Sequence, residues 1–322
     1  MLLTNIPKTA IILKVKDDCF PKKIFKEKNL SLKRFLPTLI FFLFFLLSFS
    51  IYFFNSRRNQ QKSFSEFSIP TPFAIEITKN DSKSILITNS GEWMIVKPIT
   101  EKADEEKVRK LINELNTLKA ENVFTNFKGL KEYGLNPPIV KLKVYSENKM
   151  KELWFGERSI DEKYRYFITV EETNKIFLCY SYKIETPFED LSDFREKGIF
   201  FIPSGEIEKI ILKTKKELYI LKPKNINGEK QWVVVNKNEK FVNGFNEKLV
   251  DIYSLSVANF LEGEKSFMKN YEISIYSKDL TNTLWFSGKI EDKKWLAKAQ
   301  GKNGLFIVES DNLDNIFKVE EK

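Results

Sequence analysis

The sequence predicts an α+β protein with a single N-terminal transmembrane helix followed by two tandem, duplicated units, each a mostly antiparallel sheet with one helix. Three observations predict this fold. Residues 35–54 form an uncharged apolar run, strand-like segments recur through the rest of the chain, and core-facing positions of two helical segments are related by one constant offset. With 322 residues, 42% of them hydrophobic and 30% charged, the chain has enough apolar material for two domain cores.

The apolar run FLPTLIFFLFFLLSFSIYFF comprises the twenty residues 35–54. As a helix it would span about 30 Å, which is the thickness of the hydrocarbon layer of a membrane. Basic residues are concentrated on its N-terminal side, from Lys22 to Arg34, and positive flanks stay in the cytoplasm. We therefore predict a single-pass helix in a bacterial cytoplasmic membrane, with a basic cytoplasmic tail (residues 1–34) and an extracytoplasmic C-terminal part.

Two alternatives to this interpretation stay open. Ser48 and Ser50 form a poor small-x-small site, at which signal peptidase cleavage would release the C-terminal part from the membrane. Leu30 or Leu32 could be the true start of the chain, which would shorten the tail without changing the topology. The tail is also a candidate contact for anionic lipids, although positive flanks are expected on any anchor of this orientation.

A polar stalk is predicted for residues 55–72, because prolines end a segment without hydrophobic periodicity. The first α+β repeat, residues 73–202, contains a segment with apolar positions at helical spacing from residue 108 to residue 118. An acidic cluster just before it, at residues 104–106, suits a helix N-terminus better than a catalytic pair. The strand-like segments of this repeat are 74–78, 84–89, 93–98, 139–145, 153–156, 164–170 and 175–180.

The second α+β repeat, residues 203–322, shows the same order of elements. A helix is predicted over residues 244–261. Strand-like segments precede and follow it at 209–213, 218–221, 232–235, 271–276, 284–288, 294–299 and 305–309. The matching order favours a duplication over two unrelated domains.

An offset of 137 residues relates the helices of the two repeats. It places four core-facing positions of the first helix on four of the second: Val108, Ile112, Leu115 and Leu118 on Phe245, Leu249, Ile252 and Leu255. Tryptophans recur before and after both helices, at Trp93 and Trp232, and at Trp154 and Trp285. We therefore predict that these four tryptophans occupy equivalent core positions rather than a ligand site.

Most of the basic excess lies in the N-terminal part of the chain. The sequence has 53 Lys and Arg residues against 44 Asp and Glu, a formal net charge of +9. Residues 1–54 hold nine basic and three acidic residues, so an excess of only three is left for the rest of the chain. A C-terminal part with so small an excess is not expected to bind nucleic acid.

The sequence carries no recognisable catalytic constellation. It contains no histidine, which excludes Ser–His and Cys–His nucleophile pairs as well as His-ligated metals and haem. Its twelve glycines form neither a P-loop nor a dinucleotide fingerprint. Cys179 is expected to be a buried small hydrophobe, and Asp190, Asp193 and Glu196 to form a solvated face. We predict no catalytic, cofactor-binding or metal-binding residue, no cofactor, and a protein that is not an enzyme.

Two short motifs stand out as candidate structural joints or partner contacts. Tyr133-Gly134-Leu135-Asn136-Pro137-Pro138 combines a glycine that can adopt positive φ with prolines that fix the entry into a strand. Asp193-Phe194-Arg195-Glu196-Lys197 lies between the repeats and uses one of only seven arginines. The candidate residues of these joints are Tyr133, Gly134, Leu135, Pro137 and Arg195.

With these motifs the sequence resembles the bacterial family called domain of unknown function 4340. The resemblance covers about residues 70–322 and rests on the Tyr-Gly-Leu-Asn-Pro-Pro corner, a Leu-Trp-Phe-Gly strand and the Asp-Phe-Arg-Glu-Lys joint. It departs in the second repeat, where residues 262–270 contain no equivalent corner. The resemblance implies an accessory protein without assigned enzymatic activity, often encoded beside gliding-motility-type ABC exporters, whose permease and ATPase subunits would be its partners.

The sequence thus favours a non-enzymatic, membrane-anchored extracytoplasmic accessory or binding protein of an ABC-type transport complex. Two alternatives remain. A cell-envelope hydrolase could act through carboxylates alone, because that chemistry needs no histidine. A module that binds an envelope polymer would need no catalytic group at all. The sequence does not indicate a small-molecule ligand.

Overall fold

The computed structural model describes residues 36–60, 69, 71–81, 83–147, 149–226, 228–263 and 265–321. The predicted cytoplasmic tail, residues 1–34, and residues 61–68 and 70 of the predicted stalk lie outside the described residues. The chain divides into two compact units, Met1–Asn59 and Gln60–Lys322. Both predicted repeats belong to the second of these units.

Helix α1 (Leu36–Gln60) contains all the described residues of the first unit and ends at the first residue of the second. Its aromatic rings stack at a spacing of four residues, with centroid distances of 6.2 Å for Phe45–Phe49 and 6.1 Å for Phe49–Phe53. The helix continues through residues 55–60, which were predicted to belong to the stalk. Among the residues that the structure describes, no helix combines the length and the apolar character needed to cross a membrane.

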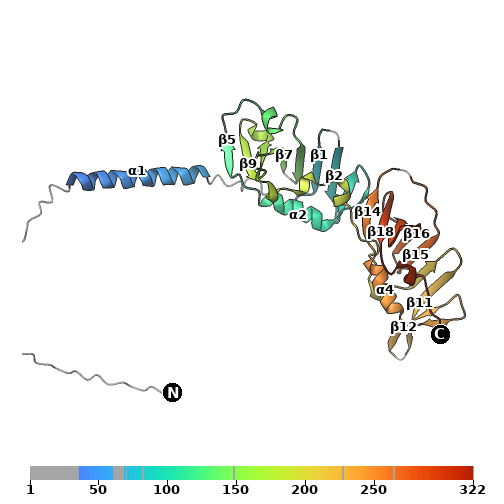
Figure 1. The fold of residues 1–322 in the computed structure, drawn as a ribbon. Helices are drawn as coiled ribbons and strands as arrows, with labels where there is room; N and C mark the ends of the chain where they lie inside the picture. Colours follow the sequence, from blue (N-terminus) through green and yellow to red (C-terminus); the bar gives the residue numbers. More distant parts are fainter. Residues whose placement is uncertain are drawn as a thin grey trace, which may run out of the picture. The chain divides into compact units, whose positions relative to one another are not determined.

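The first repeat is built on a nine-stranded antiparallel sheet with the order β4-β3-β2-β1-β6-β7-β8-β9-β5. Its strands are β1 (Ala74–Lys79), β2 (Lys83–Asn89), β3 (Trp93–Lys97), β4 (Glu101–Lys102), β5 (Asn122–Phe124), β6 (Val140–Ser146), β7 (Lys149–Arg158), β8 (Tyr164–Thr169) and β9 (Ile176–Tyr180). Its helices are α2 (Glu105–Asn116) and α3 (Leu191–Phe194), with short 3₁₀ turns η3 (Leu130–Tyr133), η4 (Val170–Glu172), η5 (Ser181–Lys183) and η6 (Thr186–Phe188). Helix α2 runs along one face of this sheet (Figure 1).

The second repeat is built on another nine-stranded antiparallel sheet, with the order β13-β12-β11-β10-β15-β16-β17-β18-β14. Its strands are β10 (Lys209–Lys213), β11 (Leu218–Ile226), β12 (Glu229–Val234), β13 (Lys240–Val242), β14 (Val257–Leu261), β15 (Tyr271–Tyr276), β16 (Thr281–Glu291), β17 (Lys294–Ala299) and β18 (Leu305–Glu309). Its helices are α4 (Phe245–Ser254) and α5 (Leu313–Ile316), and η7 (Ser204–Glu206) precedes β10.

The two sheets have the same topology. Adding nine to every strand number of the first order gives the second order without exception. An aromatic pair shows the same correspondence in the cores: Phe155 contacts Phe188 edge-on, at 6.0 Å, and Phe286 contacts Phe317 in the same manner, at 6.2 Å. The predicted α+β class with two duplicated, mostly antiparallel sheet-plus-helix units is therefore confirmed.

Each core lies between one face of a sheet and its helix. In the first repeat, alternate residues of β1 such as Ile75 and Ile77 are fully buried, as the period of a strand requires. Helix α2 buries Val108, Leu111 and Leu115 against them. The Asp104 side chain caps this helix by accepting a hydrogen bond from the backbone N–H of Lys107, at 3.0 Å. The acidic cluster thus forms the N-terminus of α2, with Asp104 as the N-cap and Glu105 and Glu106 in the first turn.

The prediction of one helix over residues 244–261 was wrong in its second half. Helix α4 ends at Ser254, and residues 257–261 form the edge strand β14, which pairs with β18. Leu255 and Val257 are both buried while Ser256 is exposed, so the side chains alternate as in a strand. The short edge strands β4, β5 and β13 were not predicted either.

The tryptophans follow their predicted equivalence only in part. Trp232 is buried in the second core and Trp93 packs against the first. Trp154 lies on the opposite side of β7 from Leu153 and Phe155, in a separate cluster with Tyr133 and Tyr166. Trp285 is half-buried, with the Lys269 ammonium 4.0 Å from its ring. Trp154 and Trp285 therefore occupy equivalent positions of the two repeats, as predicted, but these positions lie outside the two main cores.

Candidate functional site

The predicted corner follows η3 and turns the chain into β6. The backbone N–H of Leu135 donates to the Leu130 carbonyl at 3.0 Å, and Gly134 adopts φ of 63°, a left-handed conformation that favours glycine. Leu135 also forms a bridge with Pro138 across the turn, and the Asn136–Pro137 peptide bond is cis. Pro137 is exposed whereas Leu135 is fully buried. The motif therefore forms a tight corner fixed by its own backbone.

The corner lies directly on strand β7. A Cβ atom added at Gly156 would be 2.1 Å from the Tyr133 carbonyl oxygen, and one added at Gly134 would be 2.9 Å from the Glu157 backbone nitrogen. The Tyr133 ring contacts the edge of the Tyr166 ring, with centroids 4.9 Å apart. Four of the five candidate residues thus belong to a segment that covers the outer face of the first sheet.

Arg195, the fifth candidate, lies at the junction between the two repeats. Its guanidinium binds both oxygens of Glu101, with Nη2 to Oε2 at 2.7 Å and Nε to Oε1 at 3.3 Å. The side chain of Glu101 is fully buried and that of Arg195 is 9% exposed. The guanidinium carbon also lies 3.4 Å from the centroid of the Phe260 ring, which belongs to β14 of the second repeat.

The second repeat contributes further hydrogen bonds to the same carboxylate. The backbone N–H of Asn303 donates to Glu101 Oε2 at 2.9 Å, and the Asn303 side-chain amide donates to the Thr100 carbonyl at 2.7 Å. The ammonium of Lys302 is 3.9 Å from Glu101 Oε1. Burial is the main cause that lowers the pKa of Lys302. Two cations therefore face one buried carboxylate.

The linker backbone is paired with both repeats. The backbone N–H of Glu196 donates to the Lys102 carbonyl at 3.1 Å, and the N–H of Val257 donates to the Lys197 carbonyl at 2.9 Å. Bridges join Ala103 to Arg195 and Gly198 to Ser256. The corner and Arg195, which the sequence singled out together, take part in different contacts: the corner closes one sheet face, and Arg195 joins the repeats.

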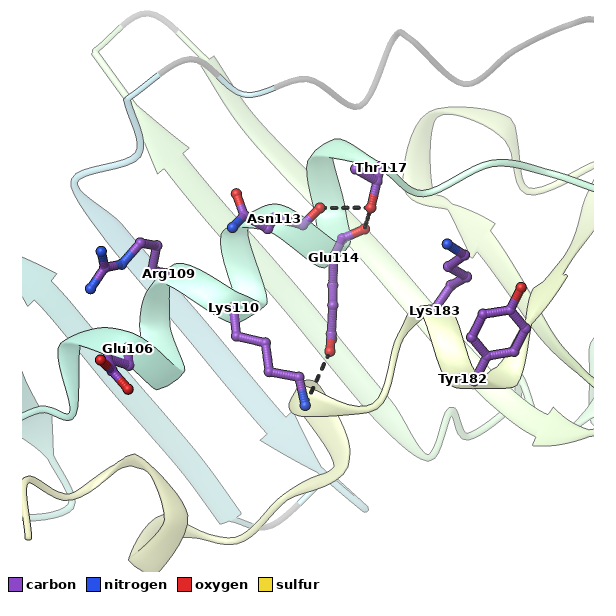
Figure 2. A pocket seen from close by; sticks show the side chains of 8 residues that line it. All are labelled: Glu106, Arg109, Lys110, Asn113, Glu114, Thr117, Tyr182 and Lys183. Atoms are coloured by element: carbon purple, nitrogen blue, oxygen red, sulfur yellow. Dashed lines mark hydrogen bonds and ion pairs between the residues drawn. The ribbon is translucent and has the colours of Figure 1, made fainter.

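An open groove beside α2 was not predicted. Its volume is about 480 Å³, and Figure 2 shows that it lies between α2 and the turn η5. Its lining residues are Glu106, Arg109, Lys110, Asn113, Glu114, Thr117, Tyr182 and Lys183. The helical periodicity of the α2 polar face was visible in the sequence, but nothing there showed that residues 182–183 lie across from it.

Glu114 has a structural role at the floor of this groove. Its carboxylate accepts hydrogen bonds from the Thr186 N–H at 3.0 Å, the Thr186 hydroxyl at 2.8 Å and the Glu185 N–H at 3.2 Å. Lys110 lies 3.7 Å away. Burial raises the pKa of Glu114 in spite of these contacts. Its negative charge is thus largely used to hold η6 against α2.

Cys179 is buried inside β9, as expected, where burial raises the pKa of its thiol to about 12. Its cross-strand neighbour Arg165 is also buried, and its guanidinium lies 3.6 Å from the centroid of the Phe188 ring. Arg165 Nη1 donates to the Gly156 carbonyl at 2.9 Å. Burial lowers the pKa of Arg165 to about 10. The described residues contain no group of three or more His, Cys, Asp or Glu side chains placed to hold a metal ion.

Comparisons with known proteins place this chain in a family. The family model described as domain of unknown function (DUF4340) matches residues 93–274, from strand β3 of the first repeat to β15 of the second. No curated protein and no solved structure matches the chain. The family match includes the corner, the groove beside α2, and Glu101, Arg195 and Phe260 of the junction, whereas Lys302 and Asn303 lie beyond its end. It covers more than half of the 322 residues. The chain therefore belongs to the DUF4340 family.

Proposed function

We propose that this protein is a non-enzymatic accessory subunit of an ABC-type export complex, anchored in the bacterial cytoplasmic membrane by a single N-terminal helix. The apolar run at residues 35–54 and the basic residues before it support the anchor and its direction. The two repeats would then lie outside the cytoplasm, where they dock on the permease or on the exported substrate. The ATPase subunits would be held in the same complex through the permease.

The junction at Arg195 is the observation that carries this proposal. A buried ion pair with Glu101, a hydrogen bond from Asn303 to the same carboxylate and a cation–π contact with Phe260 converge on it, and the linker backbone pairs with both repeats. Separating the two repeats would cost free energy, because breaking a buried ion pair leaves an uncompensated charge. Such a junction would hold the two repeats together, so that they present one fixed surface to a large partner.

The reactive groups on the chain support a binding role more than catalysis. The sequence has no histidine, and the Cys179 thiol is buried with a pKa far above neutral. The carboxylate of Glu101 is already paired with two cations, Arg195 and Lys302. Glu114, the more buried carboxylate of the groove, is committed to hydrogen bonds with the backbone and hydroxyl groups beside it.

Protease treatment of spheroplasts tests the topology. For this experiment a tag is added to the C-terminus of the full-length protein. The tag and the repeats are expected to be digested in intact spheroplasts while a cytoplasmic marker stays protected. Detergent lysis before treatment provides the control that the protease reaches the cytoplasmic marker. If the repeats are digested only after lysis, the proposed orientation is wrong.

Crosslinking in living cells tests the partner. After gentle detergent extraction, the tagged full-length protein is expected to recover an ABC permease and its ATPase in near-stoichiometric amounts, as measured by mass spectrometry. A tagged single-pass protein of unrelated sequence serves as the control for nonspecific recovery. Purification without any transporter subunit would contradict the export role.

Binding of an envelope polymer is the second candidate, and the groove beside α2 favours it. The groove is open, so a long chain could pass through it without threading. A carboxylate hydrolase has less support. Glu106 and Glu114 both line the groove, but Glu114 is already engaged by three hydrogen-bond donors.

A further inference from the structure

A stack of three tyrosine rings ends at the groove. Tyr164 and Tyr180 face each other across β8 and β9, with centroids 5.0 Å apart and ring planes at 27°. Tyr180 in turn lies 5.4 Å from Tyr182, at 35°. Tyr182 is 62% exposed although it is the last ring of this stack. The two rings behind it hold an aromatic face at the edge of the groove without covering it.

Three cations line the groove together with Tyr182. Arg109 and Lys110 are exposed on α2, and the Lys183 ammonium lies 5.3 Å from the centroid of the Tyr182 ring. Figure 2 shows Lys183 beside the Tyr182 ring, Lys110 paired with Glu114, and Arg109 on the side of α2 away from Tyr182. Since Glu114 is held by its own hydrogen bonds, Glu106 is the carboxylate that remains at the far end. The groove thus offers an aromatic face together with positive charge.

We propose that this groove binds a segment of an acidic polysaccharide. A pyranose ring has an apolar face of C–H groups that stacks on an aromatic ring, and its carboxylate would pair with Lys183, beside Tyr182, or with Arg109 further along the groove. The exposed amide of Asn113 would bind sugar hydroxyls. The volume of about 480 Å³ lies within the roughly 300–1,000 Å³ of ligand sites, and the open form suits a polymer rather than an enclosed metabolite.

A nucleic-acid strand also combines stacking with negative charge, but the groove favours the saccharide. Glu106 would repel a continuous run of phosphates. The part of the chain after residue 54 carries an excess of only three positive charges, so it lacks the broad basic surface that phosphate backbones need. This inference rests on the proposed function in one respect: the repeats must lie outside the cytoplasm to meet an envelope polymer.

Calorimetric titration of the purified full-length protein in detergent tests the inference. The probes are oligogalacturonate, an uncharged malto-oligosaccharide of the same length, and a single-stranded oligonucleotide. Oligogalacturonate is expected to bind, more weakly as salt is added, and the other two probes are expected to bind at least about tenfold more weakly. Absence of oligogalacturonate binding, or tighter binding of the oligonucleotide, would overturn the inference.

Variants locate the site. Tyr182→Ala is expected to weaken oligogalacturonate binding about tenfold and Tyr182→Phe to preserve it, because stacking needs the ring and not the hydroxyl. Lys183→Ala is expected to weaken binding and to reduce its dependence on salt. Phe241→Ala and Lys215→Ala, at exposed positions of the second repeat, are the matched controls. Equal losses in the controls, or no loss in Tyr182→Ala, would show that the saccharide binds elsewhere.

The outcome can be separated from that of the proposed function. The titration measures a property of the purified protein, whereas the spheroplast and crosslinking experiments measure its orientation and partners. If the repeats are extracytoplasmic and the transporter is recovered, a negative titration rejects the groove inference alone. If the titration is positive and the repeats are cytoplasmic, the groove binds such ligands but the envelope setting is wrong.

Discussion

Gly134 and Gly156 are the two glycines at which the chain of the corner comes closest to strand β7. Their Cα hydrogens face backbone atoms of the neighbouring segment, and Gly134 also has positive φ. Side chains at either position would push the corner, and with it Leu135, away from Ile168 and Ile176. The glycine of the corner could be found from the sequence, but its partner Gly156 could not, because no local pattern shows a close approach between segments.

Gly134→Ala tests this close approach. The substitution is expected to lower the free energy of unfolding by about 1 to 3 kcal/mol, because it combines a strained left-handed backbone with a clash against Glu157. Urea unfolding of the full-length protein measures the change. Gly205→Ala is the control, since a Cβ there meets no atom within 4 Å and should change stability by less than about 0.5 kcal/mol. Equal effects of both substitutions would contradict the assigned packing.

The buried thiol of Cys179 makes stability depend on pH. Burial raises its pKa from an ordinary value of 9.0 to about 12, so between these values the folded chain keeps a proton that the unfolded chain loses. Unfolding therefore becomes more favourable as pH rises, by up to about 1.4 kcal/mol per pH unit from this group. Cys179→Ala is expected to flatten the decline of stability above pH 9, measured by urea unfolding at several pH values. An unchanged slope would show that the thiol is not responsible.

At the scale of elements, helices α2 and α4 show what a repeated pattern can and cannot predict. At the offset of 137 residues three pairs are buried in both repeats: Val108 with Phe245, Leu115 with Ile252 and Leu118 with Leu255. The fourth pair fits less well, because Ile112 is only partly buried and the fully buried Leu111 falls on Lys248. The apolar residues of β14 (Val257–Leu261) were wrongly predicted to continue helix α4. A short edge strand contains too few residues to reveal a period of two. Long strands with alternating burial, such as β1 and β6, were predictable for the opposite reason.

The two helices begin differently, which allows a test of capping. Asp104 caps α2 through its side chain, whereas α4 begins after Gly244, which has positive φ and no side chain to offer. Asp104→Ala is expected to lower the free energy of unfolding by about 1 kcal/mol, because the Lys107 N–H loses its acceptor. Glu105→Ala, one residue later, removes a charge near the helix start without removing the cap and should cost about half as much. Hydrogen exchange of the first turn of α2 would locate the effect.

In the second compact unit, the contacts at the Arg195 junction are the ones that join the two repeats. Arg195 could be singled out because it is a rare arginine between two repeats. Its partners could not, since Glu101 and Asn303 are 202 residues apart in the sequence. The duplication and the sheet-plus-helix class were predictable, and the contacts that unite the two sheets were not. Local patterns report burial and period, whereas the junction depends on three segments that meet only after folding.

Arg195→Ala tests the junction. It is expected to lower the free energy of unfolding by about 3 to 5 kcal/mol, because the Glu101 carboxylate would remain buried with a weaker partner. Hydrogen exchange should increase in the linker and in β14, on both sides of the junction. Lys224→Ala, which breaks the exposed pair with Glu239, should change stability by at most about 1 kcal/mol. An equally small loss for Arg195→Ala would show that the buried pair does not hold the repeats together.

The paired linker at residues 195–198 also has a mechanical consequence. A free linker behaves as a hinge, so a pull on one domain only straightens the chain before any force reaches the other. Here the linker is hydrogen-bonded to Lys102 on one side and to Val257 on the other. A displacement imposed on one repeat is therefore transmitted to the other until these bonds and the Glu101 contact rupture. Under tension the two repeats therefore move as one rigid body and not as two flexibly linked domains.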